Sequence, residues 1–368
     1  MNAGPTAHRF PLVARSRPLC TGLSARIGAL ADLADRAHRD NDPTAASRVY
    51  NQAALIASDS AQPDLARHWC HRHARAWLHH DHLATIPARH ALEPLVNLAR
   101  LHIRVGDHDD GFQLINDLYH AVAHRTDTVI DGIPLPAAAL TPTDDSHREL
   151  VRWLWGVHLA DGTRALTSAG RWNEAEAHLQ QHHGIGHRML DGRQVAIIAR
   201  ITRNQHTAAL QMIDQTHPGE PWEAAVTACL TAMSQPNDPP PPEHTALMTQ
   251  RYHDVALDPS QIVFHTRLAL TIIELTGGIS RPDVAAIAQR VVRAAVSTAD
   301  GYAARDILTH AAWAQSLEAE PRRALTEVLN DSGHNHPMPA PLIEHLTATL
   351  GRCEATIRQC CYRTEMNR

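Results

Sequence analysis

Small apolar residues recur along much of the chain at the three- and four-residue spacing of one face of a helix. Residues 30–37 carry such a stripe in Leu30, Leu33, Ala34 and Ala37, and residues 46–53 carry a second stripe after a polar break at Asn41. Apolar positions with this period predict amphipathic helices. Two stripes separated by a short polar break predict a helical hairpin.

The break between two stripes has a recurring form, in which a turn residue is followed five positions later by a small residue. The clearest example is the stretch 169–179, and Asn204 begins a similar phrase 34 residues after Gly170. A small side chain at this position lets the two helices approach closely. Five such pairs occur: Asn41 and Ala46, Gly106 and Gly111, Gly170 and Ala175, Asn204 and Ala209, and Ala319 and Ala324.

In size and spacing these units resemble the tetratricopeptide (TPR) repeat, a helical hairpin of about 34 residues that stacks into solenoids. The usual Trp and Tyr positions of the repeat are mostly replaced. The resemblance implies an all-α fold, a TPR-like solenoid of helical hairpins. The chain is also similar to the helical sensor part of actinobacterial TPR-containing regulators. A generic α-helical bundle is the alternative.

Two stretches interrupt the helical pattern. Residues 125–146 hold a predicted β-hairpin from Val129 to Ile133 on an Asp-Gly turn, followed by a Pro-containing loop. Residues 234–245 contain a Pro-rich run that cannot be helical. We therefore predict four parts, listed in chain order: a flexible basic tail at 1–21, repeats at 22–233 with the insertion at 125–146, a linker at 234–245, and further helical repeats at 246–368.

Helix boundaries are also readable in several places. Pro94 is expected at the first turn of a helix that ends near Gly106, after a short partner helix at 88–92. The C-terminal part is expected to hold helices at 246–257, 260–276, 283–299, 301–317, 321–330 and 340–362.

Composition excludes several kinds of function. All 34 residues of the Lys+Arg total are arginine, so Schiff-base, Walker A and kinase-type lysine chemistry is excluded, and we expect no cofactor. A net charge of −5 argues against direct binding of nucleic acid. No apolar run reaches the length of a membrane span, so we expect a cytoplasmic protein without membrane contact. Six cysteines without regular spacing indicate reduced thiols.

Histidine and cysteine clusters offer potential metal ligands without the spacing of a metal site. The densest cluster holds His68, Cys70, His71, His73, His79, His80, Asp81 and His82. It has neither a HExxH nor a CxxC pair, and we predict no metal there. Near the C-terminus Cys353 and Cys360 share a helix face, while Cys361 does not. That face predicts either a core contact or a homodimer contact.

Polar residues on the predicted inner helices are the candidates for ligand binding. They are Asn97, Arg100, Arg104, Asp161, Arg164 and Arg193. Arginine forks can bind carboxylates at two points. This arrangement resembles the way TPR proteins hold a peptide carboxylate, although the lysines of that clamp are absent. The expected function is a binding or regulatory protein that holds a peptide, a small molecule or a protein partner in a concave groove.

The alternative function is an enzyme or accessory protein of specialised metabolism whose pocket combines the groove with the insertion. Its acids and bases would be Asp127, Asp131, Asp161 and His187, with Arg164 and Arg193 holding an anion. No nucleophile motif supports a particular reaction.

Overall fold

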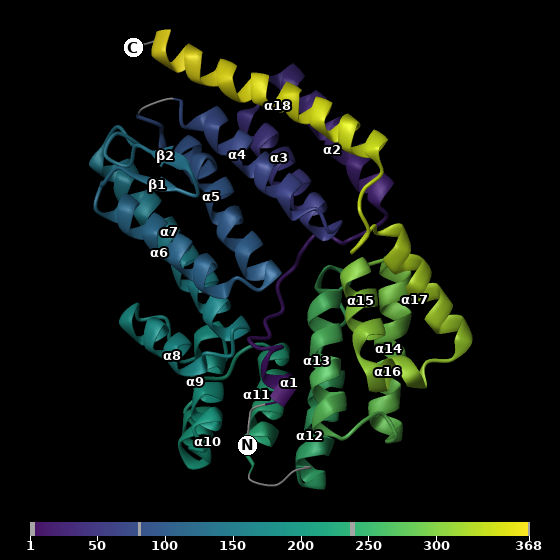
Figure 1. The fold of residues 1–368 in the computed structure, drawn as a ribbon. Helices are drawn as coiled ribbons and strands as arrows, with labels where there is room; N and C mark the ends of the chain where they lie inside the picture. Colours follow the sequence, from purple (N-terminus) through teal and green to yellow (C-terminus); the bar gives the residue numbers. More distant parts are fainter. Residues whose placement is uncertain (1–3, 80–81, 236–239, 367–368) are drawn as a thin grey trace. The chain divides into compact units, whose positions relative to one another are not determined.

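The computed structural model describes residues 4–79, 82–235 and 240–366, and in them the chain is α-helical apart from one two-stranded sheet (Figure 1). This confirms the predicted all-α class with a small β-hairpin insertion. Within these residues, no helix combines the length and the apolar character that a membrane crossing requires. The predicted Pro-rich linker lies partly outside the described residues, since these omit Pro236 and Pro239.

The chain divides into two compact units that are not continuous in sequence. The first unit comprises Leu23–Ala169 and Asn335–Arg368, and the second comprises Met1–Gly22 and Gly170–His334. The sequence predicts a linker at 234–245, where a Pro run interrupts the helical pattern, and this linker stays a prediction. A helix begins at Pro242, the last residue of that run, within the second unit.

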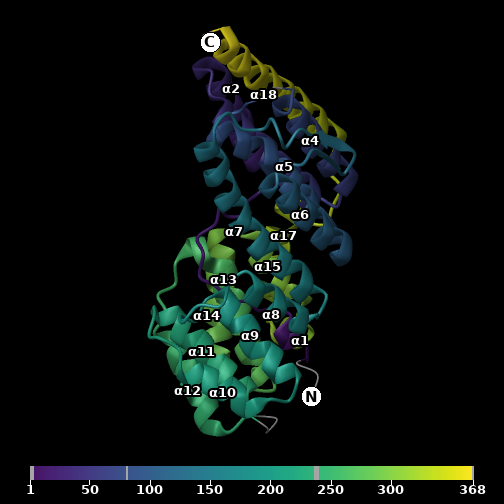
Figure 2. The same ribbon diagram turned by 90° about the vertical axis from the view of Figure 1, so that its left-hand side faces the viewer.

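The first unit consists of helical hairpins, against which the C-terminal helix packs. Its helices and strands are α2 (Leu23–Asp40), α3 (Pro43–Asp59), α4 (Pro63–Trp77), α5 (Thr85–Val105), α6 (His108–Ala123), β1 (Thr128–Ile130), β2 (Ile133–Leu135), α7 (Asp144–Ser168) and α18 (Ala340–Met366). Consecutive helices from α2 to α7 contact one another, and α3, α5 and α7 also touch in that order and form one layer. The long helix α18 lies along α2 and α3 (Figures 1 and 2).

The predicted hairpin turns have the backbone conformation that their residues favour. Asn41 and Gly106 end α2 and α5 with φ of 51° and 98°, a left-handed conformation that Asn and Gly adopt most readily. In the second unit Gly170 and Asn204 do the same, with φ of 74° and 58°. The small residues five positions later are all buried: Ala46, Gly111, Ala175 and Ala209.

The fifth predicted turn differs. Ala319 is the first residue of α17, and Leu325 is the buried residue beside Ala324. The helix expected at 301–317 is divided in two at His310, which has an extended ψ of 104° and accepts a hydrogen bond from the Trp313 N–H. The predicted continuous helix is therefore interrupted at His310, whose imidazole caps the second helix.

Pro94 also differs from its expected place, since it lies inside the single helix α5 rather than at a helix start. Proline lacks a backbone donor, which is why the sequence suggests a boundary there. Pro94 is buried within α5, and burial against neighbouring helices outweighs the local preference.

The insertion forms the predicted hairpin. Asp131 and Gly132 form the turn with φ of 49° and 75°, and Ile130 pairs with Ile133 across it. Ile130, Ile133 and Leu135 are buried, while Val129 points outward. The Asp131 carboxylate accepts hydrogen bonds from Arg67 and His71 of α4, so the turn is tied to a helix of the same unit.

Helix α18 uses its apolar face inside the first unit. Leu346, Leu350, Cys353 and Ile357 all belong to the hydrophobic core of this unit. The Glu354 carboxylate accepts a hydrogen bond from Arg72 of α4 at 2.7 Å. The Cys353 face, which suggests a homodimer contact from the sequence, is therefore already buried within the chain. The side chains of Cys360 and Cys361 lie outside the described residues.

The second unit contains α1 and the helices from α8 to α17. Their bounds are α1 (Gly4–Ala7), α8 (Trp172–Gln181), α9 (Asp191–Thr202), α10 (His206–Asp214), α11 (Pro221–Met233), α12 (Pro242–His253), the 3₁₀ turn η1 (Pro259–Gln261), α13 (Ile262–Leu275), α14 (Pro282–Thr298), α15 (Gly301–Thr309), α16 (Ala311–Ser316) and α17 (Ala319–Asp331). Residues 4–22, here called the N-segment, lie against this unit.

We predict that Gly111→Ala destabilises the first unit. A Cβ at Gly111 would lie 2.7 Å from the Ile103 Cγ1 atom and 3.0 Å from the Ala99 carbonyl oxygen. Overpacking of this kind costs about 1–3 kcal/mol, so the midpoint of thermal unfolding should fall. Gly28→Ala is the matched control, because a Cβ there meets nothing within 4 Å, and it should leave the midpoint equal or higher. Equal midpoints for the two variants would contradict the close helix approach.

Candidate functional site

Three of the predicted ligand-binding residues meet in the first unit, on the layer formed by α3, α5 and α7. The Arg100 guanidinium of α5 donates to both oxygens of Asp161 of α7, with Nη2 at 2.8 Å from Oδ2 and Nε at 3.1 Å from Oδ1. Arg100 also donates to the Asn97 side chain, which in turn donates to Asn51 of α3. Arg100, which the sequence suggests as a ligand-binding cation, is therefore paired with a carboxylate of α7, the neighbouring helix of the layer.

A second ion pair lies further along the same layer. Arg104 donates to the Asp59 carboxylate at 2.6 Å, and Arg26 of α2 lies 3.6 Å from the same carboxylate. The Asp59 side chain is fully buried, and a buried carboxylate is stable only when it is paired. Arg104 and Arg100 therefore have partners within the chain, in Asp59 and Asp161. These ion pairs connect helices of the first unit.

The remaining predicted ligand-binding residues lie apart. Arg164 is exposed on α7. Arg193 of α9 is buried and donates to Thr216 and to the carbonyl oxygens of Gly186 and Met212. These contacts give Arg193 a structural role, because they satisfy the carbonyl oxygen of Gly186 in the loop before α9 and that of Met212 in the last turn of α10.

The residues proposed for an enzyme also have separate local partners. Asp127 accepts from the Ala138 N–H at 2.9 Å, and Asp131 is held by Arg67 and His71. His187 belongs to the second unit, where its ring stacks on His217 at 4.9 Å. Within the first unit, Asp127 and Asp131 bind groups of the insertion and α4, whereas Asp161 binds α5. No recorded contact joins any two of the four proposed groups within the described residues.

The histidine and cysteine cluster of α4 is distributed around the helix. Cys70 and His73 are buried, His68 is exposed, and His71 binds Asp131. Burial raises the pKa of the Cys70 thiol to about 12 and lowers the pKa of His73 to about 3. Both groups are therefore neutral at pH 7. His80 and Asp81 lie outside the described residues.

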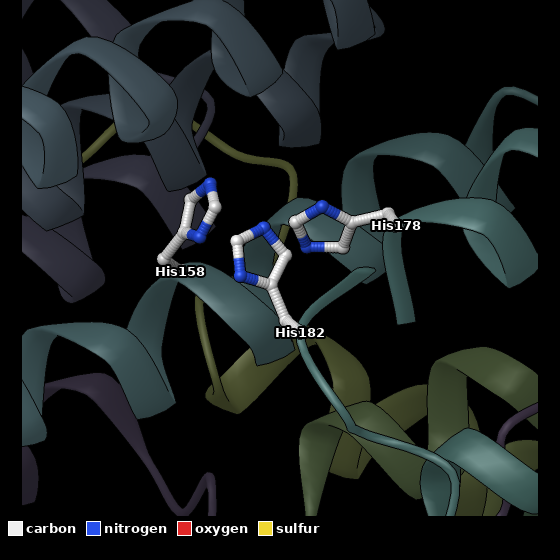
Figure 3. Close-up of side chains that lie close together, drawn as sticks. All are labelled: His158, His178 and His182. Atoms are coloured by element: carbon white, nitrogen blue, oxygen red, sulfur yellow. The ribbon is translucent and has the colours of Figure 1, made fainter. Parts of the chain in front are cut away.

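A pair of histidines that the sequence analysis did not single out lies at the end of α8. His178 and His182 are one turn apart, with ring centroids separated by 4.9 Å (Figure 3). The third residue that Figure 3 labels, His158, belongs to α7 of the first unit, where its ring stacks on Tyr119 at 4.6 Å. His178 lies within α8, and His182 is the residue that follows its last turn. The absence of a metal stays a prediction.

The main feature that sequence reasoning missed is the N-segment, which is expected as a loose tail but is bound along the second unit. Leu12 is held at both backbone groups by the side chain of Gln194 of α9. The Leu12 N–H donates to Gln194 Oε1 at 2.7 Å, and Gln194 Nε2 donates to the Leu12 carbonyl oxygen at 2.8 Å. Gln194 is completely buried and Leu12 is 2% exposed.

A second backbone contact holds the other end of the N-segment. The Cys20 N–H donates to Asp300 Oδ2 at 2.8 Å, and the Gly301 N–H donates to the Cys20 carbonyl oxygen at 2.8 Å. The other Asp300 oxygen accepts from the Ala303 N–H and caps α15. One buried carboxylate therefore caps a helix and also holds the backbone of the N-segment. Between the two contacts, the Arg17 N–H donates to the Ser260 carbonyl oxygen at 3.0 Å.

A charged contact fixes the beginning of the N-segment. Arg9 forms a two-point ion pair with Glu274 of α13, with Nη2 at 2.6 Å from Oε1, and Thr6 donates to the same carboxylate at 2.7 Å. Burial by itself would raise the pKa of Glu274, but the hydrogen bonds from Arg9 and Thr6 outweigh it, so the pKa lies below its usual value. Glu274 is therefore ionised at neutral pH and attracts a cation.

The sequence contains one weak signal for this site. Gln194 is a polar residue directly before the apolar run 195–198, and a buried polar group requires a partner.

Comparison with known protein families, with curated proteins and with solved structures finds no match for this chain.

We predict that His73 makes the first unit sensitive to acid. Between an unfolded-state pKa of about 6.5 and the folded value of about 3, the unfolded chain binds a proton that the folded chain does not. Stability should therefore fall as the pH falls below the unfolded value. His73→Phe keeps a ring against Tyr50 and removes the titrating group. The slope of the free energy of unfolding against pH should therefore fall by up to about 1.4 kcal/mol per pH unit.

Urea unfolding at a series of pH values, followed by circular dichroism, measures this slope. His68→Phe is the control on the same helix, because His68 is exposed. A slope for His73→Phe that equals those of the unchanged protein and of His68→Phe would show that His73 is not buried as a neutral ring.

Proposed function

We propose that this chain is a helical binding protein whose second unit holds extended peptide segments. The observation that supports the proposal most directly is the contact between Gln194 and Leu12. A buried side-chain amide that pairs with both the N–H and the carbonyl oxygen of one residue recognises a peptide backbone, whatever the side chain of that residue is. The N-segment then occupies the site as an internal ligand.

The geometry of the bound segment also supports this proposal. From Pro11 to Gly22 the N-segment has no helix or strand of its own, so side chains and loop groups of the second unit satisfy its backbone. A buried backbone group without a partner costs about 1–3 kcal/mol, and Gln194, Asp300 and Ser260 remove that cost at three places. Peptide-binding surfaces obtain affinity from main-chain contacts and specificity from side-chain sites in this way.

The covalent connection of the N-segment is a further argument. Residues 4–22 continue into α2 of the first unit, whereas the partners described above, Gln194, Ser260, Glu274 and Asp300, belong to the second unit. The second unit therefore holds the N-segment through non-covalent contacts alone. A segment held in this way can leave and be replaced by a competing peptide.

The TPR resemblance agrees with a role in peptide binding, since proteins of that kind hold peptides on helical arrays. We propose that the chain is a TPR-like scaffold or regulator, similar to the helical sensor part of actinobacterial regulators, and that it acts in the cytoplasm on a peptide or protein ligand. Arg100 and Arg104 stabilise the first unit through their ion pairs. The ligand site lies instead on α9, α13 and α15.

The test is binding of a synthetic peptide with the sequence of residues 5–20 to the full chain, measured by fluorescence anisotropy. In Leu12→Asp the internal segment carries a charge at a buried position, so the site should be vacated. We expect the peptide to bind this variant about 10- to 100-fold more tightly than the unchanged protein, because an occupied site lowers the apparent affinity by the unoccupied fraction. Leu12→Ala should give an intermediate value.

Ser16→Asp is the matched control, because it places the same charge on the N-segment at an exposed position. It should behave as the unchanged protein. Adding Gln194→Ala to Leu12→Asp should abolish binding, whereas adding Gln211→Ala, an exposed glutamine of α10, should not. No binding to Leu12→Asp and Leu12→Ala, with helical content retained, would show that the N-segment is a permanent part of the fold.

A further inference from the structure

We infer that this site, provided that it binds peptides as proposed, selects a partner segment in which an arginine is followed at the first and third positions by apolar residues. The chain itself presents such a pattern in Arg9, Phe10 and Leu12. The internal copy competes with the partner and keeps the site closed until the partner is abundant.

The arginine position of the pattern is determined by the carboxylate of Glu274, which pairs with Arg9. Glu274 faces Arg9, Thr6 and His310, whose Nε2 lies 3.3 Å from the Glu274 Oε1 atom. Arg9 and the Thr6 hydroxyl both belong to the N-segment, so when the segment leaves, Glu274 keeps the imidazole of His310 but loses the guanidinium. The planar guanidinium binds both carboxylate oxygens at once, which a single ammonium group cannot match. Arginine is therefore the residue that this position selects.

The two apolar positions follow from burial. Phe10 is 3% exposed and Leu12 is 2% exposed, so neither position accepts a charged side chain without a large cost. Their spacing is fixed because Gln194 holds the backbone at Leu12 while Glu274 holds the side chain at Arg9. With both ends held in this way, shifting the pattern by one residue would separate the arginine from its carboxylate.

A second arginine of the N-segment shows what the site does not select. Arg15 pairs with Asp191 at 2.7 Å, but the two side chains are 66% and 39% exposed. Exposed ion pairs contribute little to stability because water competes with them. Arg9 and Glu274 are each 18% exposed, so the two arginines of one segment differ in burial rather than in charge.

The internal copy makes binding competitive. A tethered segment acts at an effective concentration that reaches the millimolar range for short linkers. A partner segment of the same pattern therefore binds only when its concentration or affinity outweighs the tethered copy. The released N-segment would then expose Phe10 and Leu12, so that occupancy of the second unit is coupled to the state of residues 4–22.

The experiment compares four peptides on the full-length Leu12→Asp protein by fluorescence anisotropy. They are the peptide of residues 5–20 and its Arg9→Ala, Phe10→Asp and Arg15→Ala forms. We expect Arg9→Ala and Phe10→Asp to weaken binding by about tenfold or more, and Arg15→Ala by about twofold. Introducing Glu274→Gln into the protein should remove most of the difference between the parent and Arg9→Ala peptides.

The outcomes separate the two proposals. If none of the four peptides binds, the peptide-binding function fails. If all bind equally, or if Arg9→Ala and Arg15→Ala weaken binding to the same degree, the function stands and the selected pattern is wrong. If Leu12→Asp forms a dimer in light scattering and the dimer excludes the peptide, a second copy is the occupant and the partner assignment is overturned.

Discussion

The second unit depends on one requirement, which is that buried backbone groups be paired. Residues 11–22 form neither a helix nor a sheet, yet Leu12 and Cys20 are buried among helices. Helices have already used their own backbone groups, so the partners must be side chains or helix ends. Gln194 supplies both partners for Leu12, and Asp300 with Gly301 supplies both for Cys20. These contacts make an extended chain compatible with a helical core.

The first unit meets a different requirement, the close approach of helices. Left-handed residues such as Asn41 and Gly106 end a helix within one residue, and a small residue five positions later lets the next helix return against the first. Carboxylates of the layer, Asp59 and Asp161, then pair with arginines of neighbouring helices. The polar face is thus part of the packing of this unit, whereas the polar groups around the N-segment pair with the backbone of an extended segment.

The features that were predictable from sequence are those decided within a few residues. The Asp-Gly turn at Asp131, the helix end at Gly170 and the small residue at Ala209 each follow from local conformational preference or helix period. The proximity of Arg100 and Asp161 follows in part, since residues on adjoining inner helices face each other. Local patterns could not show that residues 4–22 bind a unit built from residues 170–334, or that α18 returns to α2. Pro94 misled for the same reason, because tertiary burial outweighed a local preference.

The central claim is that the second unit holds the N-segment by its backbone. Hydrogen–deuterium exchange of the full chain, read at the amides of Leu12 and Cys20, measures this most directly. The account predicts strong protection of both amides, with Gln194→Ala accelerating exchange at Leu12 far more than Gln211→Ala does. Exchange of both amides at the rate of an unstructured peptide would contradict it.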